Sequence, residues 1–313
     1  MYWWGIPTLF RCEYNKNISE CDIALAGVPH STGNGTTERD QHLGPRAVRH
    51  VSAGLRRVHL DFNINPWKKK KIFDLGDVAL PHANNNERCI EDITNFYTKI
   101  SNNKKPVVSI GGDHSITGGI LQGLGSNNLE MTKGKKISFL HIDAHTDTFT
   151  QLDHFMGAKK SAAHWGAYLV DQGIIDPKTS MQIGMRGNPR SLDWLQPSYD
   201  LGYNVVTMEE FKKRGIKDVI DQTLEKIGDN PVYITFDLDS LDATVAPAVS
   251  NIEPGFTGFT IDEAKALIQS VKNKNVIGGD VVCLMPTKDQ KNNITSMVAA
   301  SIMFEIISVI AYK

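Results

Sequence analysis

The feature that most constrains the fold is a series of short apolar runs that alternate with helix-like segments along the whole 313-residue chain. Several runs are apolar throughout, a pattern typical of strands that are buried on both faces of a parallel sheet. The runs predict strands at residues 21–28, 71–78, 107–110, 137–143, 181–184, 204–207, 232–237 and 276–282.

Amphipathic segments between these runs predict helices at residues 86–101, 209–227, 260–272 and 295–311. Thr260, followed three residues later by Glu263, forms a capping-box pattern that predicts the start of the third helix. The fold class we predict is therefore α/β: a three-layer sandwich in which helices cover a mostly parallel sheet of about eight strands. The chain contains no repeats or linker-like tracts, so we expect a single domain, residues 1–313.

The composition excludes several classes of protein. With 34 Lys and Arg against 35 Asp and Glu, the net charge of −1 gives no field that would recruit nucleic acid or an anionic membrane. Four cysteines without a CxxC spacing fit a reducing compartment. We see no signal-peptide pattern at Met1–Pro7 and no uninterrupted apolar stretch of about 18 residues. We therefore expect a cytoplasmic protein with a small-molecule partner.

Three acidic clusters, at residues 111–115, 141–147 and 236–242, each follow an apolar run. In open parallel sheets, ligands bind beyond the carboxyl ends of the strands, so we expect the clusters to share one edge of the sheet. Carboxylates held together raise one another's pKa unless a cation compensates them. Two divalent metal ions that share bridging aspartates would do so, and would also generate a nucleophilic hydroxide.

The candidate metal ligands are spread over the three clusters: His114, Asp143, His145, Asp147, Asp237 and Asp239. If the strands continue through the second and third clusters, ligands two residues apart project to the same side. A single DxD motif could equally be a sugar-nucleotide site or a solvated loop, but three clusters in this order favour a metal centre. A donor set rich in oxygen with some imidazole suits manganese better than zinc, with nickel as an alternative.

These clusters resemble the metal signatures of the ureohydrolases, the arginase and agmatinase family, and most closely its agmatinase-like branch. Supporting matches lie at residues 5–11, 27–29, 44–49, 74–78, 183–187 and 295–300. The resemblance implies an arginase-like fold, a dimanganese centre held by the six candidate ligands, and assembly as a homotrimer or homohexamer. It also implies hydrolysis of a guanidino C–N bond to urea and an amine, with agmatine as the default substrate.

The resemblance also suggests catalytic residues. It points to His164 as the proton carrier, because the family usually has a histidine between the second metal cluster and the next helix; His154 is the competing candidate. Asp143 belongs to the acids that would hold the tetrahedral intermediate. Asp242 would orient a ligating aspartate or the substrate amine, although capping of a loop explains it almost equally well.

The chain departs from the family pattern at Cys283, where a glutamate normally pairs with the substrate guanidinium. The loss of such a charge-assisted hydrogen bond costs about 1.5–3 kcal/mol. Cys283 and Glu253 are candidate substrate contacts, as is Trp165, whose bulk would shorten the pocket and favour a small substrate such as guanidine. The loop at residues 32–40 is also closer to guanidino hydrolases, some of which use nickel.

Three alternatives to agmatine hydrolysis follow from these departures. The first is a guanidine or guanidino-acid hydrolase of the same family. The second is hydrolysis of an amidine-type C–N bond, suggested by Cys283. The third is a metal-binding pseudoenzyme without activity, which the retention of all six candidate ligands argues against.

Overall fold

The computed structural model describes residues 4–35, 38–125, 129–154 and 157–313. Residues 1–3 of the N-terminal segment, in which we saw no signal-peptide pattern, lie outside these ranges, as do residues 36–37 of the loop at 32–40. The described residues contain one nine-stranded sheet, in the order β1-β3-β2-β4-β9-β8-β5-β6-β7. The strands are β1 (Glu13–Tyr14), β2 (Ile23–Val28), β3 (Ile72–Asp77), β4 (Val107–Gly111), β5 (Ser138–Ile142), β6 (Met181–Met185), β7 (Asn204–Thr207), β8 (Pro231–Asp237) and β9 (Asn275–Val282).

Every pair of neighbouring strands in this sheet is parallel, so the predicted α/β fold with a parallel sheet is confirmed. The eight strands predicted from the apolar runs correspond to β2–β9 within a few residues. The ninth strand, β1, was missed because two residues, both exposed, are too short for a recognisable pattern.

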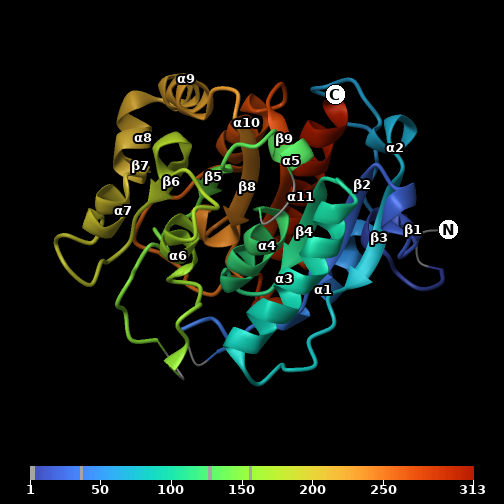
Figure 1. Cartoon of the computed structure of the whole chain (residues 1–313), viewed down its shortest axis with the longest axis horizontal. Coiled ribbons are helices and arrows are strands. Elements are labelled where there is room, and N and C mark those ends of the chain that lie inside the picture. The colour runs from blue at the N-terminus through green and yellow to red at the C-terminus, as the bar shows by residue number, and fades with distance from the viewer. Residues whose placement is uncertain (1–3, 36–37, 126–128, 155–156) are drawn as a thin grey trace.

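The helices connect the strands and cover both faces of the sheet (Figure 1). They are α1 (Gly44–Ser52), α2 (Pro66–Lys69), α3 (Asn86–Asn102), α4 (Ser115–Gly125), α5 (Leu129–Thr132), α6 (Trp165–Asp171), α7 (Gln196–Leu201), α8 (Met208–Arg214), α9 (Ile216–Ile227), α10 (Ile261–Ser270) and α11 (Ile294–Tyr312). Ile23 and Leu25 of β2 belong to the same buried cluster as residues of α10 and α11, whereas Ala24 and Ala26 belong to a second cluster with residues of α3 and α4. Alternate residues thus face opposite helical layers, as a three-layer sandwich requires.

Two predicted helix boundaries can be compared directly. The capping box at Thr260 and Glu263 is present and begins α10. The helix predicted at residues 209–227 is instead two helices, α8 and α9, because Gly215 has a backbone φ of 81°, outside the helical region. A second capping box, between Thr207 and Glu210, begins α8.

The C-terminal helix α11 is long and apolar enough to cross a membrane by length and composition alone. In this fold, however, 67% of its most apolar 18-residue stretch is buried inside the protein. It packs against α1, α10 and β9, and its one acidic residue, Glu305, contacts the ring of His59 at 2.8 Å. Its apolar composition is therefore that of a core helix.

Four central strands place the acidic clusters at one edge of the sheet. β4, β9, β8 and β5 are neighbours, and the three clusters follow β4, β8 and β5. Cys283 directly follows β9, between two of the clusters. The topology therefore gathers all the candidate ligands and the position of the missing glutamate at the carboxyl edge.

Candidate metal centre

Most candidate ligands converge from loops and turns, and Asp237 alone of the six belongs to a strand. β5 ends at Ile142, and residues 143–147 form a loop in which Asp147 has a positive φ of 52°. Asp237 is the last residue of β8, and Asp239 lies in the 3-10 turn Leu238–Ser240. The condition that the strands continue through these clusters is therefore not met.

Hydrogen bonds accepted by the first aspartates of the second and third clusters, Asp143 and Asp237, stabilise these turns. Asp143 Oδ1 accepts the backbone N–H of His145 at 2.7 Å, and Asp237 Oδ1 accepts that of Asp239 at 2.9 Å. Aspartate side chains favour such local bonds to the backbone two residues ahead. The bend that follows each strand brings the next ligand back towards the first.

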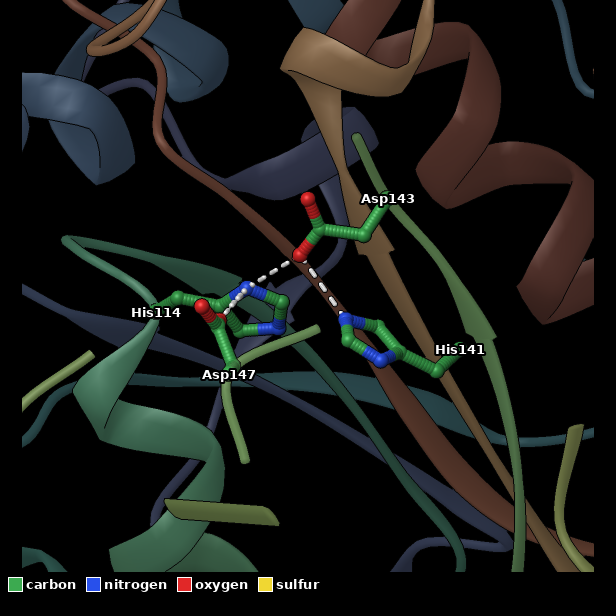
Figure 2. Close-up of side chains that lie close together, drawn as sticks. All are labelled: His114, His141, Asp143 and Asp147. Atoms are coloured by element: carbon green, nitrogen blue, oxygen red, sulfur yellow. Dashed lines mark hydrogen bonds and ion pairs between the residues drawn. The ribbon is translucent and has the colours of Figure 1, made fainter. Parts of the chain in front are cut away.

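Four residues form what we call the inner group: His114, Asp143, Asp147 and Asp237. The Nδ1 atom of His114 lies 2.9 Å from Asp143 Oδ2 and 2.9 Å from Asp147 Oδ2 (Figure 2). Asp237 Oδ2 lies 3.3 Å from the same nitrogen. All four side chains are buried. Three carboxylates therefore surround one imidazole nitrogen with little access for water.

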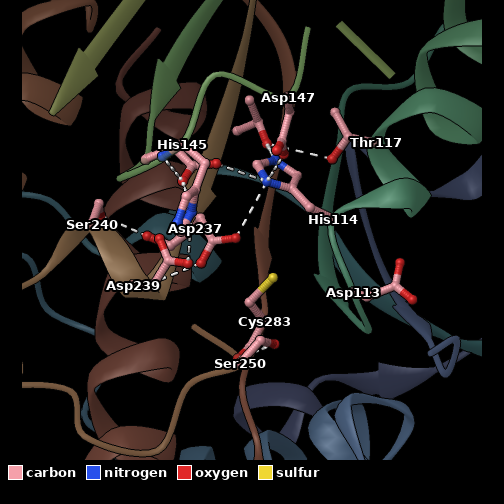
Figure 3. Close-up of polar contacts among 12 residues, drawn as sticks. Asp113, His114, Thr117, His145, Asp147, Asp237, Asp239, Ser240, Ser250 and Cys283 are labelled. Carbon is pink, nitrogen blue, oxygen red and sulfur yellow. Dashed lines mark hydrogen bonds and ion pairs between the residues drawn. The ribbon is translucent and has the colours of Figure 1, made fainter. Parts of the chain in front are cut away.

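The outer group consists of His145 and Asp239 together with Asp143, which belongs to both groups. His145 Nδ1 lies 3.2 Å from Asp239 Oδ2 and 3.4 Å from Asp143 Oδ1 (Figure 3). The His145 side chain is 32% exposed, whereas the two aspartates are buried. Because Asp143 offers one oxygen to each group, it has the geometry of a bridging carboxylate.

The hydrogen bonds around His114 test whether this arrangement fits a cation. The Thr235 hydroxyl donates to Asp280 at 2.7 Å, so its oxygen accepts the Nε2–H of His114 at 2.8 Å. This tautomer directs the Nδ1 lone pair at the three carboxylates, none of which meets hydrogen-bond geometry with it. Asp239 Oδ2 is likewise buried without a hydrogen-bond partner. A lone pair facing carboxylates needs a cation between them. Ligand atoms of His114, Asp143 and Asp147 lie within 4.8 Å of one another, as do those of Asp143, His145 and Asp239.

The pKa of His114 supports the same conclusion. Burial alone would lower this pKa, but the neighbouring carboxylates of Asp143, Asp147 and Asp237 raise it well above its usual value. The carboxylates thus favour a positive charge at this nitrogen, the position that a metal cation would take. Metal binding at such a site displaces a proton.

His141, which the sequence analysis did not assign, supports the inner group. Its Nε2 atom lies 2.8 Å from Asp143 Oδ2, and its Nδ1 atom accepts a hydrogen bond from the Gln182 amide at 3.2 Å. The ring therefore donates to Asp143, as residues next to metal ligands commonly do. Its position two residues before Asp143, at the end of β5, was the signal that could have identified it.

Arg186 and Glu253 support the outer group. Arg186 donates to the backbone carbonyls of Asp239 at 2.6 Å, Ser240 at 3.0 Å and Leu241 at 3.0 Å, which fixes the turn after β8. Glu253 Oε1 lies 3.3 Å from His145 Nε2. The sequence analysis included Arg186 only within the matched residues 183–187 and assigned it no role. It did not predict the contact of Glu253 with His145.

A cavity of about 580 Å³ reaches one ligand of each group, His145 of the outer group and Asp147 of the inner group. Its wall includes the ligands His145 and Asp147 together with Glu253, so this predicted substrate contact does face the cavity. Apolar residues such as Phe149 and Trp194 line other parts of the wall. The mixture of apolar surface with a few charged groups is typical of a small-molecule site.

The two candidate proton carriers lie in different positions. His154 lines the cavity, whereas His164 does not. His164 Nδ1 lies 2.6 Å from the Ser161 hydroxyl, and the ring makes a further hydrogen bond to the backbone of Leu152. Burial lowers the pKa of His164 below its usual value. His164 is thus not among the residues that line the cavity, although the neighbouring Ala162 and Ala163 are.

Asp242 has the contacts of the loop-capping alternative, and Trp165 lies away from the cavity. Asp242 accepts hydrogen bonds from Thr244 and from the backbone of Gly258, so it caps a loop and does not line the cavity. Trp165 is fully buried and does not line the cavity either. Its indole N–H donates to Asp147 Oδ2 at 3.0 Å. It therefore does not shorten the pocket, because the backbone turn into α6 directs the ring inward.

Cys283 lies directly below the acidic cluster in Figure 3, with its sulfur directed at the carboxylates. Its thiol is hydrogen-bonded to Asp237, and its backbone has a positive φ of 69°. Burial raises the pKa of this thiol well above its usual value, and the charges of Asp237 and Asp239 raise it further. A thiol that stays protonated cannot replace the negative charge of a glutamate.

A buried set of carboxylates and imidazoles at the carboxyl edge of a parallel sheet defines an α/β protein with a candidate site for two metal ions. A model of the arginase family matches residues 21–308, and the chain belongs to this family. Members of the family bind a binuclear metal centre and hydrolyse C–N bonds other than peptide bonds. The chain is therefore a hydrolase of this class.

Similar proteins support the agmatinase-like branch. The chain is 31% identical to the mitochondrial guanidino acid hydrolase of Homo sapiens over 303 residues, which cover 97% of this chain and 82% of that protein. It is 32% identical to an agmatinase of Escherichia coli, with 94% and 89% covered. Its structure is similar to proclavaminate amidino hydrolase from Streptomyces clavuligerus, with a TM-score of 0.88, 28% identity, and 100% and 99% covered.

Proposed function

We propose that the chain uses two metal ions to hydrolyse the guanidino C–N bond of a small guanidino compound, releasing urea and an amine. The observation that carries this proposal is the position of His114 Nδ1, which faces three buried carboxylates. Such a site is built for a cation, and its position beside a cavity gives a substrate access to it.

The inner and outer groups would hold one metal ion each, with Asp143 shared between them. When bound, the metal pair supplies a hydroxide nucleophile at neutral pH, which the weakly electrophilic guanidinium carbon requires. The oxygen-rich donor set favours manganese, with nickel as the alternative. Asp143 would keep the two groups at a fixed separation, and Glu253 would orient His145 through its Nε2 atom.

The proton that the leaving amine needs would come from His154, not His164. His154 lines the cavity, whereas the His164 ring is held behind the wall by Ser161. A histidine suits this step because its usual pKa lies near neutral pH. His154→Gln should therefore lower the rate of urea release, typically by 10²–10⁴-fold for loss of a general acid.

The cavity supports a substrate with a tail. The argument for free guanidine depended on a pocket shortened by Trp165, but Trp165 is buried away from a cavity of about 580 Å³. Agmatine or a guanidino acid fits this volume better, and the related proteins named above include an agmatinase and a guanidino acid hydrolase. With Cys283 neutral, Glu253 is a carboxylate of the cavity wall, 3.3 Å from His145 Nε2, that could pair with a guanidinium.

The direct test is to purify the chain with manganese or with nickel and to measure urea released from agmatine, guanidino acids, arginine and guanidine. We expect urea from agmatine or a guanidino acid and two metal ions per chain by elemental analysis. If metal binds but no guanidino compound yields urea, the guanidino proposal is wrong. Ammonia released from an amidine would then favour the alternative suggested by Cys283.

We also propose that the chain is a single domain that assembles into a homotrimer or homohexamer in the cytoplasm. All four cysteines are free and buried, which is compatible with a reducing compartment. Light scattering coupled to gel filtration measures the assembly directly. A monomer at micromolar concentration would contradict this part of the proposal.

A further inference from the structure

Two hydrogen bonds connect the first turn of α6 to Asp147. The indole N–H of Trp165 donates to Asp147 Oδ2 at 3.0 Å, and the backbone N–H of Gly166 donates to the Asp147 carbonyl at 2.9 Å. The same Oδ2 atom lies 2.9 Å from His114 Nδ1. One bond therefore fixes the peptide of Asp147 and the other fixes the carboxylate that faces the inner group.

Asp147 needs such support because of its backbone conformation. Its φ of 52° lies in the left-handed region, which residues other than glycine rarely adopt. Strained backbone persists only where the surrounding structure holds it in place. The hydrogen bonds from Trp165 and Gly166 hold Asp147 on both sides of its Cα atom.

The packing around Trp165 leaves its ring little freedom. The ring centroid lies 5.0 Å from those of both His114 and His141. On another side, a Cβ atom at Gly118 of α4 would lie only 3.1 Å from Trp165 Cβ, so α4 and α6 are in close contact there. Trp165 is thus held against the same helix, α4, that directly follows His114.

We propose that Trp165 is a positioning residue of the metal centre, whose indole N–H holds the Asp147 carboxylate in the orientation for metal binding. The inference rests on the proposed function, because it takes Asp147 as a metal ligand. An indole can only donate, so it leaves the carboxylate as an acceptor and does not compete for the metal. Partners of this kind typically change metal affinity by 10–100-fold when they are removed.

The test compares the metal affinity of variants by calorimetry or equilibrium dialysis. Trp165→Phe keeps the aromatic packing but removes the donor. Trp165→Gln loses the ring but keeps an N–H donor the same number of bonds from Cβ. We expect Trp165→Phe to weaken metal binding about 10–100-fold and Trp165→Gln to weaken it less. A role in packing alone predicts the opposite order, because phenylalanine fills more of the apolar space.

Trp67→Phe is the matched control. The Trp67 indole N–H donates to Cys12 Sγ at 3.0 Å within a different aromatic cluster, so its loss should leave metal affinity unchanged. In an Asp147→Asn background, Trp165→Phe should cause no further loss, because its effect passes through the carboxylate. An additional loss there would overturn the inference.

The outcomes separate this inference from the proposed function. If the wild-type chain binds two metal ions and Trp165→Phe binds them equally well, only the inference on Trp165 is wrong. If the wild-type chain binds neither manganese nor nickel, both are wrong. If Trp165→Phe does not fold, Trp165→Gln alone is compared with the control. A metal affinity of Trp165→Gln that is near normal then supports the donor role. A metal affinity more than 100-fold weaker than that of Trp67→Phe contradicts it.

Discussion

The inner and outer groups contain the same kinds of donor atom but differ in their access to water. The inner group is buried, and its histidine is fixed by Thr235, which in turn is bound to Asp280. The histidine of the outer group, His145, is 32% exposed and faces the cavity together with Glu253. The difference indicates that the inner group is specialised for holding a metal ion and the outer group for meeting the substrate.

The strongest way to break this comparison is to remove the residue that the two groups share. Asp143→Ala should abolish binding at both sites, because each group loses a carboxylate oxygen. Urea release should fall by at least about 10³-fold, as expected when a main electrostatic contact of the reaction is lost. Elemental analysis of the purified variant checks the metal content. Retention of one full metal equivalent would show that Asp143 does not bridge.

The histidines of the two groups should differ in how much their loss weakens metal binding. His114→Ala should weaken the inner site about 100-fold, whereas His145→Ala should weaken the outer site about tenfold. The reason is that water from the cavity can take the place of the exposed ligand but does not reach the buried one. Titration of the metal-free variants with manganese measures both constants. Equal losses would remove the distinction between the groups.

The partners of the histidines sharpen the comparison further. Thr235→Val leaves the buried Nε2–H of His114 without an acceptor. As long as the proton stays on Nε2, this should lower the free energy of unfolding by about 1–3 kcal/mol. Glu253→Gln keeps an oxygen near the exposed His145, so its effect on metal affinity should be smaller. Because Glu253 also faces the cavity, its substitution should raise KM for a guanidino substrate. An unchanged KM would show that Glu253 supports only His145.

The sequence predicted the sheet well because its strands are buried on both faces, which leaves a continuous apolar signal. Leu140 and Ile142 of β5 pack on one face, and Phe139 on the other. The signal fails where burial is absent, as in β1. It also fails to show a break such as Gly215, because apolar positions continue at helical spacing on both sides of it.

For the site, residue types identified the candidate ligands, but contacts between distant segments could not be deduced. Trp165 is 18 residues from Asp147 in sequence, and their hydrogen bond depends on how α6 docks beside α4. Glu253 is 108 residues from His145. The direction of the His164 ring could not be deduced for the same reason, because a motif gives the position of a residue along the chain but not the direction of its ring.

The smallest effect that we expect concerns His164 and the pH dependence of stability. Burial lowers the pKa of His164 below its usual 6.5, so the ring is neutral in the folded chain at neutral pH. Below about pH 6.5, the unfolded chain binds a proton that the folded chain does not, so stability falls as the pH falls through this range. Above it, the ring is neutral in both states and contributes no pH dependence.

His164→Gln should therefore flatten the fall in Tm between pH 6.5 and pH 5, by on the order of 1–2 °C. Glutamine can keep the contact with Ser161, so the folded structure should tolerate the change. His50→Gln is the control, because His50 is exposed on α1. Thermal unfolding of the metal-free chain at several pH values is the measurement. If His164→Gln keeps the wild-type slope while urea release collapses, His164 reaches the substrate after all, and the assignment of proton transfer to His154 is wrong.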